Sequence, residues 1–106
     1  MLGVTYKPDV NDIRESTALE ILEMLARKGA RVAYADPFVP QLTLDSLKLT
    51  AVEPSAGILA AADCVLILTK HSRFDYAAIA AHAPLVPDTR NAMKAYRAPG
   101  ASIVTL

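Results

Sequence analysis

The first 35 residues contain a short apolar segment, an amphipathic stretch and a second apolar segment, and this order constrains the fold more than any other feature. Apolar residues recur at three- and four-residue spacing over 16–28, which predicts a helix with one buried face. β-Branched and aromatic residues predict strands over 2–6 and 30–35. The short loops between these three elements imply a right-handed crossover between two parallel strands.

The same alternation continues toward the C-terminus. Further strands are predicted over 47–50, 64–68, 85–86 and 102–105, and helices over 54–61 and 76–82. Alternating elements of this kind predict an α/β fold, here a Rossmann-like three-layer sandwich with a mostly parallel sheet and helices on both faces. With 106 residues and no internal repeat or linker-like stretch, the chain is expected to form one domain over 1–106.

The composition excludes several classes of function. Eleven Lys and Arg residues balance eleven Asp and Glu residues, so no overall positive charge would attract nucleic acid or an anionic membrane. No apolar run approaches the roughly 20 residues that span a bilayer, and the N-terminus lacks a signal-peptide pattern. The single Cys64 excludes an internal disulfide. We expect a cytoplasmic protein without a nucleic-acid or membrane partner.

Polar residues are concentrated in three loops that follow predicted strands, over 7–16, 69–72 and 88–91. Ligands of parallel sheets bind outside the carboxyl ends of the strands. Lys7 and Arg14 lie beside a helix N-terminus, whose free N–H groups suit phosphate; the alternative is that Arg14 only pairs with a surface neighbour. Arg90 has a forked guanidinium suited to carboxylate or phosphate, and the alternative for its loop is a surface turn.

Four other residues have reactive or ligand-binding side chains, and the sequence around each of them indicates whether it has a functional role. Cys64 lies in an apolar predicted strand, which predicts a buried, unreactive thiol. His71 lies in a candidate ligand loop and His82 at a helix end, without metal-ligand spacing, so no metal is predicted. Asp36 stands where dinucleotide-binding folds place a ribose-binding acid, but the glycine fingerprint is absent. Asp36 is therefore predicted to form a turn, and NAD is not expected to bind here in the standard Rossmann manner.

Three motifs stand in order along the chain. They read GVTYKPDVNDIRES over 3–16, with YADP over 34–37 after the predicted helix, then ADCVLILTKH over 62–71, then DTRN over 88–91. Together they resemble the C-terminal, UDP-binding domain of the UDP-glucose/GDP-mannose dehydrogenase family, and the likeness covers the whole chain.

The resemblance implies an NAD-dependent oxidoreductase of polysaccharide biosynthesis, a UDP-glucose or UDP-N-acetylhexosamine 6-dehydrogenase. Family members convert C6 of a nucleotide sugar from alcohol to carboxylate in a four-electron oxidation. They carry an N-terminal Rossmann domain for NAD and a central helix that forms a homodimer. By motif, Lys7 and Arg90 would bind the UDP-sugar substrate, and Arg14 would face the NAD cofactor across the domain cleft.

The chain also departs from the family pattern. The family's catalytic cysteine lies upstream, in a segment that this chain lacks, and Cys64 does not match it. We therefore expect no catalytic residue, no N-terminal NAD domain, no central helix and no turnover by the chain alone. Lys70 replaces a common acidic residue, and Pro87 an aliphatic one. The residues DTRN over 88–91 and Val39-Pro40 resemble those of the family branch that acts on UDP-N-acetylhexosamines.

Two other functions remain open on the sequence. One is a free-standing α/β nucleotide-binding or regulatory module without catalysis. The other is a structural domain whose charged loops only mediate subunit contacts.

Overall fold

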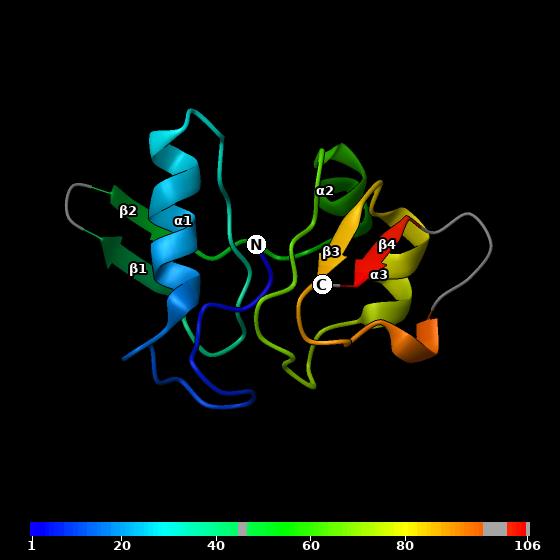
Figure 1. Cartoon of the computed structure of the whole chain (residues 1–106), viewed down its shortest axis with the longest axis horizontal. Coiled ribbons are helices and arrows are strands. Elements are labelled where there is room, and N and C mark those ends of the chain that lie inside the picture. The colour runs from blue at the N-terminus through cyan, green and yellow to red at the C-terminus, as the bar shows by residue number, and fades with distance from the viewer. Residues whose placement is uncertain (45–46, 97–101, 106) are drawn as a thin grey trace.

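The computed structural model describes residues 1–44, 47–96 and 102–105 (Figure 1). Its elements, in chain order, are helix α1 (Thr17–Arg27), strands β1 (Gln41–Leu44) and β2 (Leu47–Thr50), helices α2 (Ala56–Ala61) and α3 (Tyr76–His82), strand β3 (Val86–Asp88), the 3-10 turn η1 (Lys94–Tyr96) and strand β4 (Ile103–Thr105). Helices and short strands occur together, which confirms the α/β class.

Parallel pairing joins segments that are far apart in the sequence. β3 pairs with β4 in parallel, and isolated parallel bridges join Leu2 to Ala35, Leu2 to Ile67, and Ile67 to Asp88. The first segment (residues 2–6) therefore lies between the second (30–35) and the third (64–68), and β3 and β4 follow beyond the third. In open α/β sheets, the point where the strand order reverses is where ligands bind.

The pairing is sparser than predicted. The predicted strands over 2–6, 30–35 and 64–68 each contribute a single bridging residue, so the sheets are small and the three-layer sandwich is not confirmed. In the first segment the cause is Gly3, whose φ of +88° turns the chain directly after Leu2.

The three helices are in the predicted places. α3 has the predicted bounds, and α1 lies one residue inside the predicted range at each end. Ser16 is the N-cap of α1, and its hydroxyl donates to the backbone oxygen of Val4 at 2.7 Å. This bond fixes the start of α1 to the first segment, so the loop between them is closed at its base.

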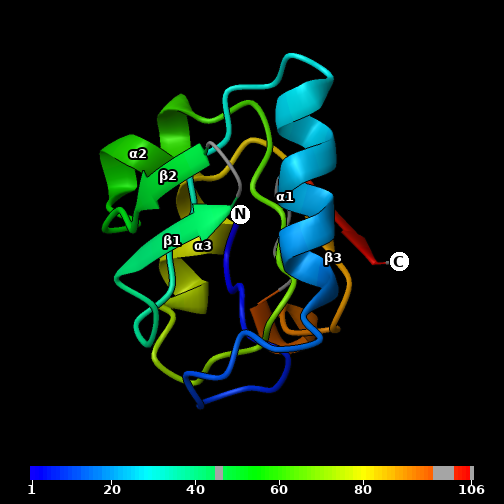
Figure 2. The same ribbon diagram turned by 90° about the vertical axis from the view of Figure 1, so that its left-hand side faces the viewer.

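Two apolar clusters hold these elements together. In one, Val4, Leu22 and Leu42 bring the first segment, α1 and β1 together, while β1 pairs with β2 antiparallel. In the other, Ile67 and Ile79 are buried with residues of α2 and β3. Figure 1 shows α1 with the β1–β2 hairpin at one end of the molecule and α2, α3, β3 and β4 at the other, and Figure 2 views the molecule from the end that carries α1 and the hairpin. The first segment contributes to both clusters.

Cys64 is exposed, so the prediction of a buried thiol is wrong. The buried part of its segment begins one residue later, at Val65, where the backbone N–H donates to Leu85. Among the described residues, no helix combines the length and the apolar character needed to cross a membrane.

Candidate functional site

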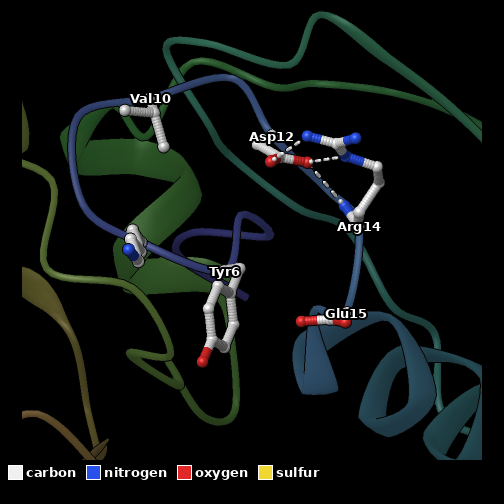
Figure 3. A pocket seen from close by; sticks show the side chains of 6 residues that line it. Tyr6, Val10, Asp12, Arg14 and Glu15 are labelled. Atoms are coloured by element: carbon white, nitrogen blue, oxygen red, sulfur yellow. Dashed lines mark hydrogen bonds and ion pairs between the residues drawn. The ribbon is translucent and has the colours of Figure 1, made fainter.

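A cavity of about 540 Å³ lies on the loop that joins the first segment to α1 (Figure 3). It is lined by Tyr6, Lys7, Val10, Asp12, Arg14 and Glu15. Glu15 adjoins the N-cap of α1, so the cavity opens beside the end of the helix that carries free N–H groups and a partial positive charge. The structure thus brings Lys7 and Arg14 together, as two of the three predicted site residues.

The guanidinium of Arg14 is bound to Asp12. Its Nε and Nη2 each donate to one carboxylate oxygen at 3.0 Å, and Figure 3 shows the side chain turned toward Asp12. These hydrogen bonds lower the pKa of Asp12 to about 2 and raise the pKa of Arg14 above its usual value. Arg14 is 86% exposed, so the surface pair considered as its alternative role is present in the structure.

Lys7 lines the same cavity and is exposed. Its backbone oxygen accepts a hydrogen bond from the Thr5 hydroxyl at 2.8 Å. Within the part of the chain that the structure describes, no ion pair joins Lys7 to a carboxylate. Lys7 and Arg14 are thus the two cations of the cavity lining, and among the described residues only Arg14 has a carboxylate partner.

Arg90 follows β3, which is separated from the first segment by the segment around Ile67, and it is not part of the cavity lining. Its Nε donates to the backbone oxygen of Leu68 at 3.0 Å. Its loop is held by the buried carboxylate of Asp88, which accepts from the N–H groups of Arg90, Ala92 and Met93 at 2.8–3.1 Å. The loop is therefore an ordered turn around a buried anion.

The sequence did not predict a buried polar cluster between these loops. His71 and Asp36 are both fully buried in their side chains, and Nε2 of His71 lies 2.8 Å from Oδ2 of Asp36. Asp36 also accepts from the N–H groups of Val4 and Phe38. Burial alone would raise the pKa of Asp36, but these hydrogen bonds, led by the one with His71, outweigh it and hold the pKa below its ordinary value. Asp36 thus forms the predicted turn with Phe38 and anchors two further segments.

Asp9 connects this cluster to the cavity loop. Its backbone N–H donates to Nδ1 of His71 at 2.9 Å, and its carboxylate accepts from the N–H and hydroxyl of Ser72. Asp9 has a φ of 62°, which is uncommon outside glycine. Over residues 1–44, 47–96 and 102–105, no group of three His, Cys, Asp or Glu side chains is arranged to hold a metal ion.

The sequence was also compared with known families. The sequence model of the UDP-glucose/GDP-mannose dehydrogenase family, UDP binding domain, matches residues 1–95. The chain belongs to this family. The cavity, the Asp36–His71 pair and the Asp88 turn all lie within the matched residues. In nucleotide-sugar dehydrogenases, this UDP-binding domain is the C-terminal one.

Similar proteins support the same assignment. UDP-glucose 6-dehydrogenase of Rickettsia bellii (strain RML369-C) is 32% identical, over 90% of this chain and 24% of the enzyme. UDP-N-acetyl-D-mannosamine dehydrogenase of Campylobacter jejuni is 35% identical, over 69% of this chain and 19% of the enzyme. The solved UDP-N-acetyl-mannosamine dehydrogenase Cap5O of Staphylococcus aureus has a TM-score of 0.74 and 29% identity, over 98% of this chain and 25% of that one.

These relatives are oxidoreductases that act as nucleotide-sugar dehydrogenases. The chain spans about a quarter or less of the length of the curated relatives it matches.

Proposed function

We propose that this chain binds the uridine diphosphate part of a UDP-sugar at the cavity of the Lys7 loop. The observation that carries the proposal is the position of this cavity, beside the N-terminus of α1 in a domain of this family. Backbone N–H groups at a helix start and an adjacent cation favour a diphosphate.

The charges around the cavity assign separate roles to its residues. The cavity lining has two positive side chains, Lys7 and Arg14, and two negative ones, Asp12 and Glu15. Arg14 and Asp12 already form an ion pair with each other, which leaves Lys7 as the cation without a carboxylate partner among the described residues. Lys7 is therefore proposed to contact the diphosphate. Arg90, which follows β3 and is hydrogen-bonded to Leu68, is proposed as the second substrate-binding cation. Glu15 is an acceptor suited to ribose hydroxyls or the uracil N–H.

We further propose that the chain acts as part of an NAD-dependent UDP-sugar 6-dehydrogenase that oxidises the C6 alcohol to a carboxylate. The residues described here do not fit the pyrophosphate of NAD, because the space beside Gly3 is filled by Thr69 and no glycine-rich turn follows. NAD is therefore assigned to another domain, with Arg14 alone facing it. We expect no catalytic turnover by the chain alone. We propose that the homodimer contact belongs to the larger dehydrogenase of which the chain is a part.

The test is a titration of UDP into the isotope-labelled chain, with GDP as the contrasting nucleotide. We expect UDP to shift the amide signals of residues 6–15 and 88–91. Lys7→Met should weaken binding about tenfold, the order expected for one charged contact. Lys28→Met is the matched control, because Lys28 is an exposed lysine at the C-cap of α1.

Two outcomes would overturn the proposal. One is the absence of any shift at millimolar UDP. The other is equal binding by Lys7→Met and Lys28→Met. A start codon at Met1 with no dehydrogenase sequence upstream, together with UDP binding, would instead favour the free-standing module.

A further inference from the structure

The hydrogen bonds around His71 allow only one tautomer of its ring. Nδ1 accepts the backbone N–H of Asp9 at 2.9 Å, so Nδ1 carries a lone pair. The proton is therefore on Nε2, which lies 2.8 Å from the Asp36 carboxylate and 3.2 Å from the Thr5 hydroxyl oxygen. The Thr5 hydroxyl donates its own proton to the backbone oxygen of Lys7, so it can only accept from the ring. The single Nε2 proton therefore goes to Asp36, the nearer acceptor, and the bonds from Asp9 to Nδ1, from Nε2 to Asp36 and from Thr5 to Lys7 are satisfied together. The Thr5 hydroxyl oxygen, at 3.2 Å, is only a second contact of that same proton.

The ring itself is held firmly. Its side chain is fully buried, and the rings of Phe38 and Phe74 lie 5.0 and 5.5 Å from it, centre to centre. The backbone oxygen of His71 accepts from the hydroxyl of Tyr76 at 2.6 Å. Because no part of the ring is exposed, it cannot touch a ligand in the cavity.

The loop that lines the cavity is hydrogen-bonded to this ring at Asp9, and it also lies against the ring through Thr5, whose hydroxyl oxygen is 3.2 Å from Nε2. Nδ1 holds the backbone of Asp9 in its positive-φ conformation, and the Thr5 hydroxyl holds the carbonyl of Lys7. Ser72, the residue after His71, binds the carboxylate of Asp9 from the outside. Non-glycine residues keep a positive φ only where their surroundings enforce it.

We infer that His71 is a positioning residue for UDP binding, with Asp36 selecting the tautomer whose Nδ1 lone pair fixes Asp9 and thereby places Lys7 in the cavity. The inference rests on the proposed function for the identity of the ligand. It assigns to a buried histidine, remote from the ligand, a share of the binding affinity.

Two substitutions separate positioning from stability. An Asn side chain at position 71 offers an acceptor at the place of Nδ1 and leaves Asp36 without its donor. A Gln side chain reaches the place of Nε2, keeps the donor to Asp36 and leaves the Asp9 N–H unbound. We expect His71→Asn to be the less stable variant in chemical denaturation but to bind UDP about tenfold more tightly than His71→Gln.

Amide hydrogen exchange is measured in the same two variants and in the wild type. The nitrogen NMR spectrum of the His71 imidazole is measured in the wild type. Wild type should show an Nε2–H tautomer, and slow exchange of the Asp9 amide should persist in His71→Asn and be lost in His71→Gln. An Nδ1–H tautomer in the wild-type chain would overturn the inference even if neither variant folded. Binding that merely follows stability in the two variants would overturn it as well.

Failure of the proposed function looks different. If the wild-type chain does not bind UDP, the proposed function is wrong. The tautomer of His71 and the exchange rate of the Asp9 amide still decide whether His71 positions the loop. If UDP binds to wild type and both variants bind it alike, only the role of His71 is refuted.

Discussion

Thr69 occupies the space that any side chain on Gly3 would need, because a Cβ at Gly3 would stand 2.4 Å from the Cβ of Thr69. Gly3 also has a φ of +88°. We expect Gly3→Ala to lower the free energy of unfolding by about 2 kcal/mol or more, the sum of backbone strain and overpacking. Thermal or urea denaturation measures this loss.

The other described glycines provide the controls. Gly29 has a φ of +94° but nothing within 4 Å of its Cβ position, so Gly29→Ala should cost only the strain, about 1 kcal/mol. Gly57 lies inside α2 with open space around it, and Gly57→Ala should stabilise the chain by about 0.5–1 kcal/mol. Equal losses for Gly3→Ala and Gly29→Ala would show that the contact with Thr69 does not matter.

The Asp36 carboxylate should make the fold sensitive to acid. Its pKa is lower in the folded chain than its ordinary value, so its contribution is complete above about pH 4 and is lost as the pH falls through that value toward the folded pKa. In Asp36→Asn, an amide N–H₂ must face one of the backbone donors, Val4 or Phe38. We expect a loss of about 1–3 kcal/mol at neutral pH and a flatter acid dependence. Denaturation of both proteins from pH 3 to pH 7 would measure this, with the exposed Asp63→Asn as control.

Tyr76 should produce the opposite dependence at alkaline pH. Burial, followed by the nearby charges of Asp9 and Asp88, raises its pKa to about 12. Because the folded chain keeps this phenol protonated, stability should fall as the pH rises from about 10 to about 12. Tyr76→Phe should remove that part of the alkaline loss of stability. In the tyrosinate absorbance, the variant should lack the component that titrates near pH 12. An unchanged titration curve would contradict the assignment.

Asp88 should stabilise the turn that carries Arg90. Its two oxygens accept three backbone N–H groups, and an Asn has only one oxygen to offer. Asp88→Asn should therefore cost about 1–3 kcal/mol and weaken the order of the Arg90 side chain. Asp75→Asn is the matched control, because Asp75 is the N-cap of α3 and Asn caps helices equally well. Denaturation and the Arg90 Nε–H signal measure the two effects.

Local periodicity was enough to predict the helices. α1 and α3 carry apolar residues at helical spacing, and such a pattern needs no information about distant residues. The strand lengths depend on pairing across the sheet. Gly3 ended the first strand after Leu2, and β1 was not predicted because its partner β2 is what makes it a strand.

The candidate site was predicted only in part for a related reason. Lys7, Arg14 and Arg90 were found because they follow strands or stand in recognisable motifs, and their proposed roles still await the titrations above. His71 and Asp36 are 35 positions apart, and nothing periodic connects them. In the sequence His71 stands within the polar run over 69–73, so no local signal pointed to a buried partner.

The place of Leu2 between Ala35 and Ile67 affects how the chain can fold. A segment at the start of the sequence must pair with one that lies more than half the chain away, and closing such a loop is entropically costly. The first crossover can form early and locally, but the middle of the sheet cannot be completed until the segment around Ile67 has been synthesised and docked. We therefore expect the slow step of folding to be the joining of two halves that meet along the N-terminal segment.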